Sequence, residues 1–426
     1  MSLKKVFLVE GLRTPFVKSG KEFADIHPKL LATSNLKELL YKMNFKGDEI
    51  DEVVLANTSV LTDAPNIARV VALQAGLHKK TSATTIVKNC GSSLESFIIS
   101  LSKIQTGLYE SIITGGMESM SYIPFFLPYK FTQKLKDFMI AKTVKQKIRS
   151  LLSFKKTDLK ISHPLMQLLT DPFTGCSMGE TAELLAKEFN ISRFDQDEFA
   201  LNSHEKAHKA KDKLKEEMFS FFTEKQVIDT DKGVKVDISK DSMAKFSPFF
   251  DKKYGTVTIA NSCPVNDGSA MLILMSEERM KSMGLKPLVS VKSSHFMGLE
   301  PERMGLGPVY ASSVALKKAD LSLKDMGLIE INEAFSAQVL ACLKAFSSQK
   351  FCEEKLGLNK AIGEIDSNKL NVNGGAIAIG HPVSATGARL ILTLAKEMKR
   401  KQVEFGLASL CIGGGQGGAV ILQNVA

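Results

Sequence analysis

The sequence predicts an α/β fold in which two similar halves are separated by an inserted domain. Strand-like and helix-like patterns alternate over residues 1–120 and again over residues 271–426. A strand, a helix and a second strand within about thirty residues are typical of a unit on a parallel or mixed sheet. Residues 121–270 break this alternation with prolines, basic residues and long polar helices. We therefore expect three segments with these boundaries.

The bulk composition excludes several classes of protein. The chain has 426 residues, 44% of them hydrophobic and 24% charged, as in soluble globular proteins with a large core. Its six cysteines include no C-x-x-C pair, which argues against a zinc ribbon or a thioredoxin-type motif and fits a reducing compartment. The apolar run near the start ends at Glu10, too early for a secretory signal. No apolar run is long enough to span a membrane.

In the first half, short apolar runs predict strands, and apolar residues at helical spacing predict the helices between them. Leu94, Phe97, Leu101 and Ile104, for example, fall on one face of a helix. The predicted strands are Val6–Val9, Glu52–Ala56, Thr84–Val87 and Ser111–Gly116, and the predicted helices are Leu30–Met43, Asn66–Gly76 and Leu94–Gln105. We expect the third strand to be buried and to lead directly into the turn that contains Cys90.

The second half follows the same plan. Beyond the polar helix Arg193–Lys213 of the insert, strands are predicted at Met271–Met275, Leu328–Ile331, Phe405–Leu410 and Ala419–Leu422, and helices at Val314–Leu321, Asn332–Phe346 and Val383–Lys399. In each half a strand delivers a cysteine, Cys90 or Cys411, into a turn rich in glycine or serine. This similarity indicates two copies of one plan, although no residue-level repeat is visible.

Two turns near the C-terminus carry residue types that transfer protons. His381 lies between Gly380 and Pro382, and Cys411 opens a turn in which five of the next seven residues are glycine. Glycines at this density let the backbone approach a ligand closely. Either turn alone is more often a structural feature, but the two together with the turn at Cys90 favour a catalytic site.

Cys90 is the candidate nucleophile, because unpaired N–H groups and the dipole at a helix start favour a thiolate. We therefore expect a lowered pKa, with a buried structural cysteine as the open alternative. His381 is the candidate base, and Cys411 would handle a carbon proton. Backbone N–H groups such as that of Gly413 would form an oxyanion hole. A metal site made by the two thiols and His381 is the weaker alternative, since no further ligand accompanies them.

Asn332 stands between an apolar strand and a helix, and two interpretations remain open. In the simpler one its side chain caps the helix. In the functional one it holds a water or an acyl oxygen.

Taken in order, these motifs resemble those of the thiolases, enzymes that make or break 3-ketoacyl-CoA. The resemblance covers nearly the whole chain and is carried by Asn373–Pro382, Asn332–Phe335, Cys411–Gly417, Asn89–Ser92, Met178–Glu183, Gly255–Thr258 and Leu12–Pro15. It implies two similar α/β halves in a five-layered αβαβα arrangement, with a loop domain inserted in the first half. It also implies coenzyme A and acyl-CoA as substrates, with no cofactor and no metal.

The resemblance assigns roles to single residues. Cys90 would accept the acyl group, His381 would activate it, and Cys411 would act on the α-carbon of the acetyl unit. His381 and a water held by Asn332 would form one oxyanion hole, and the N–H groups of Cys90 and Gly413 the other. Substrate contacts are expected at Ser293, which matches a serine that touches pantetheine, and at Met178, Phe335 and Gly380 in the family motifs.

The chain departs from the family pattern at Ser93, Ser177, Ser384 and Thr386. Ser177 stands where short-chain biosynthetic members have histidine, which weakens an interpretation limited to acetoacetyl-CoA. The basic insert, together with Ala64–Arg69, looks more like the thiolase subunit of the fatty-acid oxidation complex. A thiolase of fatty-acid β-oxidation is thus the first hypothesis, and a biosynthetic acetoacetyl-CoA thiolase is the alternative.

Two further alternatives fit the residues less well. A decarboxylating condensing enzyme would use a Cys-His-His set, against which Asn332 and Cys411 argue. A non-catalytic lipid carrier would not need Cys90, His381 and Cys411 together. We expect a homodimer or homotetramer in a bacterial cytoplasm or a mitochondrial matrix. A hydratase/dehydrogenase subunit is a candidate partner, and nucleic acid is not expected.

The insert concentrates the positive charge of the chain. Residues 130–160 carry ten basic and two acidic side chains, a net charge of +8, while the rest is close to neutral. Five apolar residues recur on one helical face: Ile140, Val144, Ile148, Leu151 and Leu152. The run Tyr122–Pro128 would add aromatic surface. Peripheral membrane contact through residues 122–155 is one hypothesis, and docking to a partner subunit and packing within the insert are the others.

Overall fold

The computed structural model describes residues 3–59, 61–124, 127–159 and 164–425. By contact the chain divides into a large unit, residues 1–122 and 171–426, and a small unit, residues 123–170. The predicted insert 121–270 spans both, because helices α7 (Met178–Glu188) and α8 (Arg193–Lys209) pack against elements of the C-terminal part. Within the described residues, none of the helices has the length and apolarity needed to cross a bilayer.

A mixed ten-stranded sheet runs through the large unit. Its strands are β1 (Val6–Arg13), β2 (Val17–Lys18), β3 (Glu52–Ala56), β4 (Ser82–Ile86), β5 (Ser111–Ser119), β8 (Asn266–Ser276), β9 (Val289–Gly298), β10 (Met326–Ile331), β11 (Phe405–Ile412) and β12 (Gln416–Asn424). Their order is β10-β11-β12-β9-β1-β8-β5-β3-β4, with β2 paired to β8. The two halves join where Phe7 and Leu8 of β1 lie opposite Ser290 and Val289 of β9.

The strand directions repeat between the halves. Starting from β1, successive pairings are antiparallel with β8, antiparallel with β5, and then parallel with β3 and β4. Starting from β9, they are antiparallel with β12, antiparallel with β11 and parallel with β10. A single parallel bridge between Leu370 and Ile329 of β10 then takes the place of β4. The predicted repetition of one plan is therefore confirmed in the topology.

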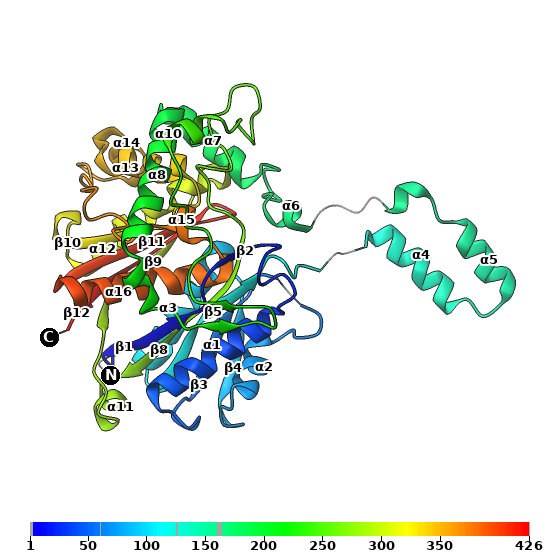
Figure 1. The fold of residues 1–426 in the computed structure, drawn as a ribbon, viewed down its shortest axis with the longest axis horizontal. Coiled ribbons are helices and arrows are strands. Elements are labelled where there is room, and N and C mark those ends of the chain that lie inside the picture. The colour runs from blue at the N-terminus through cyan, green and yellow to red at the C-terminus, as the bar shows by residue number, and fades with distance from the viewer. Residues whose placement is uncertain (1–2, 60, 125–126, 160–163, 426) are drawn as a thin grey trace. The chain divides into compact units, whose positions relative to one another are not determined.

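Helices cover both halves and also separate them (Figure 1). Helices α1 (Pro28–Met43) and α2 (Ile67–Gln74) pack on the strands of the first half, and α12 (Gly307–Ala319), with α13 (Ser336–Ser347) beside it, packs on the second. Between the halves, α3 (Ser92–Gln105) and α16 (Thr386–Lys401) contact each other and both sets of strands. The predicted five-layered αβαβα arrangement is confirmed.

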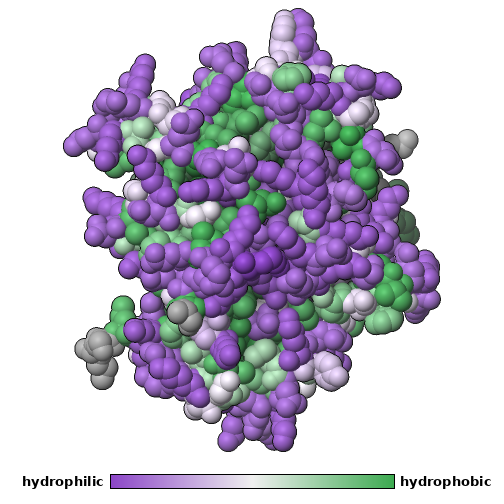
Figure 2. Space-filling view, turned by 60° about the vertical axis from the view of Figure 1, so that its left-hand side comes forward, coloured by the Kyte–Doolittle hydropathy of each residue, from purple (hydrophilic) through white to green (hydrophobic). Residues whose placement is uncertain are grey.

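Shorter elements connect these layers. They are η1 (Asn89–Gly91), α9 (Lys211–Lys215), β6 (Phe221–Phe222), β7 (Val227–Ile228), α10 (Lys240–Ala244), α11 (Glu277–Ser282), η3 (Pro301–Leu306), η4 (Leu323–Asp325), α14 (Gln349–Leu356), α15 (Ala376–Ile379) and η5 (Val383–Ala385). Three large apolar clusters fill the spaces between the layers. On the face drawn in Figure 2, hydrophilic residues dominate and hydrophobic ones form smaller areas between them.

Three sequence-based expectations about these elements are wrong. The strand that leads to Cys90 is an edge strand, β4, with exposed and half-buried residues, because it pairs only with β3. Helix α13 begins at Ser336, after the Asn332–Phe335 motif. The long polar helix of the insert is interrupted at Ala210, which separates α8 from α9.

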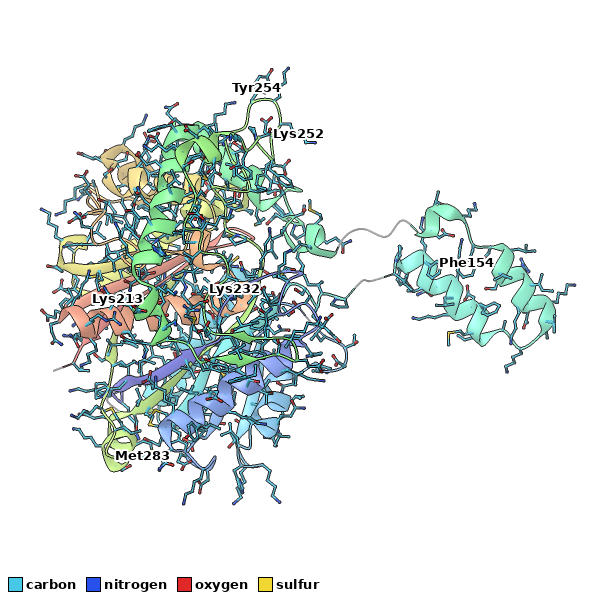
Figure 3. The ribbon with its side chains drawn as sticks, viewed as in Figure 1. Phe154, Lys213, Lys232, Lys252, Tyr254 and Met283 are labelled. Atoms are coloured by element: carbon cyan, nitrogen blue, oxygen red, sulfur yellow. The ribbon has the colours of Figure 1, made fainter. Side chains whose placement is uncertain are left out.

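The small unit contains a helical hairpin. Its elements are α4 (Tyr129–Ile140), α5 (Val144–Leu152), η2 (Lys156–Leu159) and α6 (Pro164–Leu168). The predicted continuous helical face Ile140–Leu152 is wrong, because Thr143 is extended and caps α5 by accepting a hydrogen bond from the Gln146 N–H. The Phe131 and Phe154 rings pack edge to face, with their centroids 5.1 Å apart. Figure 3 labels Phe154 in this unit. Of the predicted aromatic run, residues 125 and 126 lie outside the described residues.

Gly387, in the first turn of α16, provides a test of how closely the central helices pack. A Cβ added there would lie 2.5 Å from the backbone nitrogen of Leu94 on α3. We predict that Gly387→Ala lowers the free energy of unfolding by about 1–3 kcal/mol, because one helix must shift. Chemical denaturation followed by circular dichroism measures this loss. Gly298→Ala is the control, since the nearest atom to its Cβ would be 3.8 Å away; equal losses would contradict the prediction.

Candidate active site

The turn η1 places Cys90 between the edge strand β4 and helix α3. The Ser92 hydroxyl donates to the Asn89 carbonyl at 2.6 Å and accepts from the Lys88 N–H at 2.7 Å, which fixes the turn. Gly91 has no room for a side chain, since its Cβ would lie 2.4 Å from Cδ1 of Ile412. The turn therefore packs directly on the end of β11.

The pKa of the Cys90 thiol is raised, chiefly because burial disfavours the thiolate. A hydrogen bond from the Gly413 N–H acts in the opposite direction but is the smaller effect. The lowered pKa expected from the helix start is therefore wrong. Helix α3 begins only at Ser92, two residues after Cys90. A nucleophile of this kind needs a base to take its proton.

His381 has the hydrogen bonds of a neutral base. Its backbone N–H donates to Oδ1 of Asn266 at 3.0 Å, and its Nδ1 lies 2.6 Å from Oγ1 of Thr386. The Thr386 hydroxyl donates to the Pro382 carbonyl at 3.0 Å, so it accepts from Nδ1–H and leaves Nε2 unprotonated. Burial, with the positive charge of Arg389 in addition, lowers the pKa of His381 to about 4. The imidazole is thus neutral near pH 7.

The fold brings the turn of Cys90 to the loop of His381. Turn η1 packs against η5, which follows His381 and Pro382 directly. Gly380 is required here, because its φ is 118° and a Cβ would meet the Asn266 side chain at 2.7 Å. Asn266 thereby holds the backbone of His381 from one side, while Thr386 holds its ring from the other.

Cys411 and Asn332 lie near the ends of two neighbouring strands, β11 and β10. Cys411 is buried on β11 opposite Gly417, and burial raises its pKa well above the ordinary value. The Asn332 N–H donates to the carbonyl of Ser409, two residues before Cys411. The Asn332 amide is fully buried, and neither its Oδ1 nor its Nδ2 has a partner. The capping interpretation is wrong, because Phe335 is the residue that precedes α13; an unpaired buried amide suits an oxygen-bearing ligand.

Three of the remaining predicted positions also reach this region. A Cβ on Gly413 would lie 3.1 Å from Sδ of Met178. Phe335 forms a backbone bridge with Ser262, and its ring packs edge to face on Phe250 at 5.9 Å.

Ser293 is not brought to the cluster. It lies in the middle of β9 opposite Ile421, and its hydroxyl donates to the Ala315 carbonyl at 2.7 Å. Ile421 is four residues along β12 from Gly417, the residue opposite Cys411. Four residues of strand separate Ser293 from the thiol end of the sheet by about 13 Å.

Cys263, Asn266 and Thr386 also belong to this region, but no sequence pattern indicates their place in it. The Cys263 N–H donates to the Ala334 carbonyl at 3.0 Å, and Val265 bridges His381. These long-range pairings bring Cys263 and Asn266 to the loops that carry Ala334 and His381, and no local sequence pattern reveals such pairings. Among the residues that the structure describes, no three His, Cys, Asp or Glu side chains are arranged to hold a metal ion.

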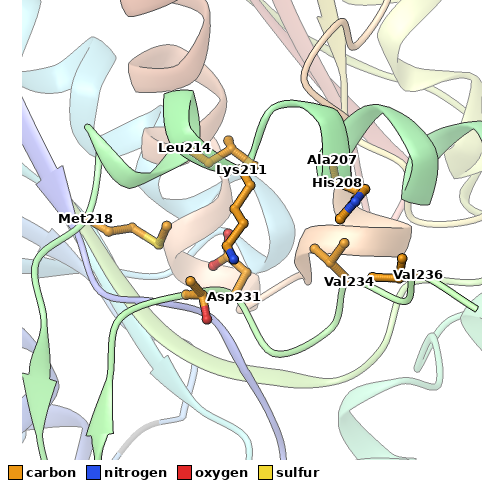
Figure 4. A pocket seen from close by; sticks show the side chains of 9 residues that line it. Ala207, His208, Lys211, Leu214, Met218, Asp231, Val234 and Val236 are labelled. Atoms are coloured by element: carbon orange, nitrogen blue, oxygen red, sulfur yellow. The ribbon is translucent and has the colours of Figure 1, made fainter.

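A cavity of about 200 Å³ lies elsewhere, beside α8 and α9 (Figure 4). Its walls include His208, Lys211 and Asp231 together with apolar side chains. None of the predicted catalytic residues lines it. Asp231 is already engaged, because it accepts hydrogen bonds from Arg13 at 2.7 and 2.8 Å. The arrangement of thiols and imidazole at the strand ends therefore remains the candidate site for chemistry.

Two layered halves that meet at a thiol, a neutral imidazole and a second buried thiol define an enzyme of acyl transfer through cysteine. Residues 6–278 match the thiolase N-terminal domain, and residues 285–424 match the thiolase C-terminal domain. The chain belongs to the thiolase family. The resemblance stated from the motifs is thereby confirmed.

Curated and solved relatives agree with this assignment over their full lengths. A 3-ketoacyl-CoA thiolase of Shewanella woodyi is 40% identical over 98% of this chain and 97% of its own. The human mitochondrial 3-ketoacyl-CoA thiolase is 35% identical with a TM-score of 0.85, and it has also been solved in complex with CoA. The Bacillus anthracis acetyl-CoA acetyltransferase is 34% identical with a TM-score of 0.85. Each of these two matches covers 100% of this chain and 100% of the solved chain.

The Thr386 hydroxyl provides a test of the tautomer of His381. We predict that Thr386→Val lowers kcat at least about 10-fold with little change in KM, because Nδ1 loses its acceptor and the proton can move to Nε2. Steady-state kinetics across pH 6–9 measure the effect, and thermal unfolding controls for stability. Thr386→Ser is the matched control and should retain most of the rate. Equal activity in the valine and serine variants would show that the hydroxyl does not set the tautomer.

Proposed function

We propose that this chain is a thiolase that cleaves 3-ketoacyl-CoA with CoA, giving acetyl-CoA and an acyl-CoA shortened by two carbons. One observation carries the proposal: the turn of Cys90 packs against the loop of His381, whose Nε2 is free to accept a proton. The full-length relatives at 40% identity are 3-ketoacyl-CoA thiolases, which supports the substrate class. A role in fatty-acid β-oxidation follows from that substrate class.

In the first half-reaction, His381 takes the proton of the Cys90 thiol and the sulfur attacks the 3-keto carbonyl. The N–H groups of Cys90 and Gly413 stabilise the resulting oxyanion. The carbon–carbon bond then breaks, leaving an acyl-Cys90 and the enolate of acetyl-CoA. Cys411 donates its proton to that enolate. Its raised pKa suits this role, because the thiol stays protonated until the carbanion forms.

In the second half-reaction, CoA replaces acetyl-CoA. The Cys411 thiolate takes the proton of the CoA thiol, and the CoA sulfur attacks the acyl-Cys90. Cys90 leaves and recovers its proton from the His381 imidazolium, so that every group returns to its starting state. The unpaired amide of Asn332 would hold a water that, with His381, stabilises charge on the thioester oxygen of the acetyl unit.

A biosynthetic acetoacetyl-CoA thiolase is the second candidate, because the same steps run in reverse form a carbon–carbon bond. The likeness to the Bacillus anthracis acetyl-CoA acetyltransferase supports this direction to the same degree as the human structure supports the other. The 40% identical relatives favour thiolysis.

We further propose that the chain forms a homo-oligomer through the edge of β4. This strand pairs with β3 on one side only, and Val87, which follows it, is 55% exposed. An unpaired edge with an exposed apolar residue is a ready site for a second copy of the chain.

All six cysteines are free, which supports a reducing setting such as a bacterial cytoplasm or a mitochondrial matrix.

The helical hairpin of the small unit is a candidate for peripheral membrane contact. No residue of α4 or α5 is buried, and Ile140, Val144 and Leu152 are 72%, 75% and 79% exposed. These exposures count against the alternative in which the three residues pack within the insert. Exposed apolar side chains among lysines suit an anionic lipid surface, to which each basic residue adds about 1 kcal/mol. A hydratase/dehydrogenase subunit is the competing occupant.

Two cysteine variants test the proposed reaction. We predict that Cys90→Ser abolishes thiolysis of a long 3-ketoacyl-CoA and of acetoacetyl-CoA while the fold is retained, because a serine hydroxyl is far less acidic than a thiol. Cys411→Ala should stop exchange of the acetyl α-proton yet still allow an acyl group on Cys90, detected by mass spectrometry. Near wild-type turnover in Cys90→Ser, or an unacylated Cys411→Ala protein, would contradict the assigned roles.

Sedimentation with vesicles tests the membrane contact. We predict that the protein pellets with phosphatidylserine vesicles at low salt and is released at high salt, because the attraction is electrostatic. Four substitutions to glutamate should abolish binding: Lys142, Lys145, Lys147 and Arg149. A matched control changes four exposed lysines of the large unit: Lys79, Lys225, Lys286 and Lys360. Absence of binding at low salt, or equal binding by both variants, would favour a partner subunit instead.

A further inference from the structure

Asn89, the residue before the nucleophile, links two segments that are 324 positions apart in the sequence. Its Nδ2 donates a hydrogen bond to the Gly413 carbonyl at 2.8 Å. Gly413 belongs to the turn between β11 and β12, and its own N–H lowers the pKa of the Cys90 thiol against the larger effect of burial. Asn89 therefore holds the carbonyl of the glycine whose amide favours the Cys90 thiolate.

The turn that Asn89 holds closes the β11–β12 hairpin beyond the pair Ile412 and Gln416, and it consists of three glycines. Gly414 and Gly415 follow Gly413 with φ of 92° and 76°, and glycine has more backbone freedom than any other residue. No side chain projects from these three positions. The Leu299 N–H fixes the far end of the turn by donating to the Gly415 carbonyl at 2.8 Å. The amide of Asn89 acts at the near end, where the Gly413 N–H must point at the reacting group.

The backbone of Asn89 is itself held firmly enough to position the amide. Asn89 adopts φ of 47°, a left-handed conformation that asparagine tolerates better than most residues. The Ser92 hydroxyl donates to its carbonyl, and Lys88, on its other side, lies 3.7 Å above the Phe296 ring and pairs with Glu95 at 2.8 Å. The residue type thus meets two requirements, the strained backbone before Cys90 and the donor toward Gly413.

We propose that Asn89 is a positioning residue of the oxyanion hole, which keeps the Gly413 N–H aimed at the sulfur of Cys90 and at the oxyanion formed beside it. Asn89 contacts no reacting atom and acts through Gly413. This inference deepens the proposed thiolase reaction and rests on Cys90 being its nucleophile. The oxyanion forms only in the transition state, so a misaligned donor weakens binding of the transition state but not of the substrate. The loss therefore falls on kcat rather than KM.

Asn89→Gly separates the two properties of the residue, because glycine accepts the left-handed φ but has no amide. We expect kcat to fall about 10-fold with KM nearly unchanged, since loss of a whole oxyanion donor costs about 10²–10³ and this donor is only loosened. Asn89→Asp is the second variant. It keeps the shape and tolerates the backbone, but it faces the Gly413 carbonyl with an oxygen. It should lose at least as much rate.

The rate of Cys90 alkylation by iodoacetamide across pH gives a readout that needs no substrate. In wild type the Gly413 N–H favours the thiolate, so its loss should move the alkylation profile of Asn89→Gly to higher pH. Asn44→Gly is the matched control, since Asn44 is also an exposed asparagine with a left-handed φ, 55°, but ends α1 away from the site. Its profile and kcat should equal those of wild type.

An alkylation profile and a kcat for Asn89→Gly equal to those of the Asn44→Gly control would overturn the proposal. The same holds if Asn89→Asp keeps full activity. Failure of the wild type to cleave 3-ketoacyl-CoA would instead count against the proposed function. The alkylation profile would still decide whether Asn89 positions Gly413, because alkylation of Cys90 needs no substrate.

Discussion

The close crossing of α3 and α16 is the constraint on which the site depends. The two helices meet where Gly387 leaves no space for a Cβ against Leu94, and the Ala388 N–H donates to the Ser93 hydroxyl at 3.0 Å. Both contacts lie in the first turns, so the starts of the two helices converge. The segment before each helix is therefore brought to the same place. One segment holds Cys90, the proposed nucleophile, and the other holds His381, the proposed base.

This geometry also explains which positions of the two halves correspond. The turn of Cys90 lies between β4 and α3, and its counterpart is the loop between Leu370 and α16 that carries His381. The sequence-based comparison of Cys90 with Cys411 was therefore wrong, because Cys411 ends β11, the counterpart of β5. A repeated fold thus supplies two equivalent helix starts, and the chemistry depends on the differences between them. The second thiol comes from near the end of strand β11.

The layer order, the repeated halves and the gathering of Cys90, His381, Cys411 and Asn332 could be predicted because strong local motifs carry them. The details that make the site work could not. The tautomer of His381 depends on a hydroxyl five residues away whose own proton goes to Pro382. Strand β4 is exposed because it lies at the edge of the sheet and pairs only with β3. The pKa of Cys90 is raised because distant segments bury the thiol. Each is a consequence of long-range packing.

A buried acidic side chain lies behind the loops that carry Asn332 and His381 and helps to hold them in place. Glu333, next to Asn332 in its motif, accepts hydrogen bonds from Ser203 at 2.6 Å, Asn371 at 2.8 Å and the Ile377 N–H at 3.2 Å. A Cβ on Gly375 would lie 2.2 Å from its carboxyl carbon, so this glycine is what lets the loop close over the acid. Burying a carboxylate is costly unless several donors satisfy it, and an arrangement that needs all of them has little freedom to rearrange.

The charge balance of the resting site follows from the same burial. Desolvation raises the pKa of Cys90 and lowers that of His381, so both members of the pair are favoured in their neutral forms. A neutral thiol is a poor nucleophile and reacts slowly with oxidants, because the thiolate is the reactive species. Proton transfer to His381 becomes favourable only when the charges that it creates are stabilised. In the proposed reaction, the N–H groups of Cys90 and Gly413 provide that stabilisation once a carbonyl group occupies the site, which would couple reactivity to the presence of substrate.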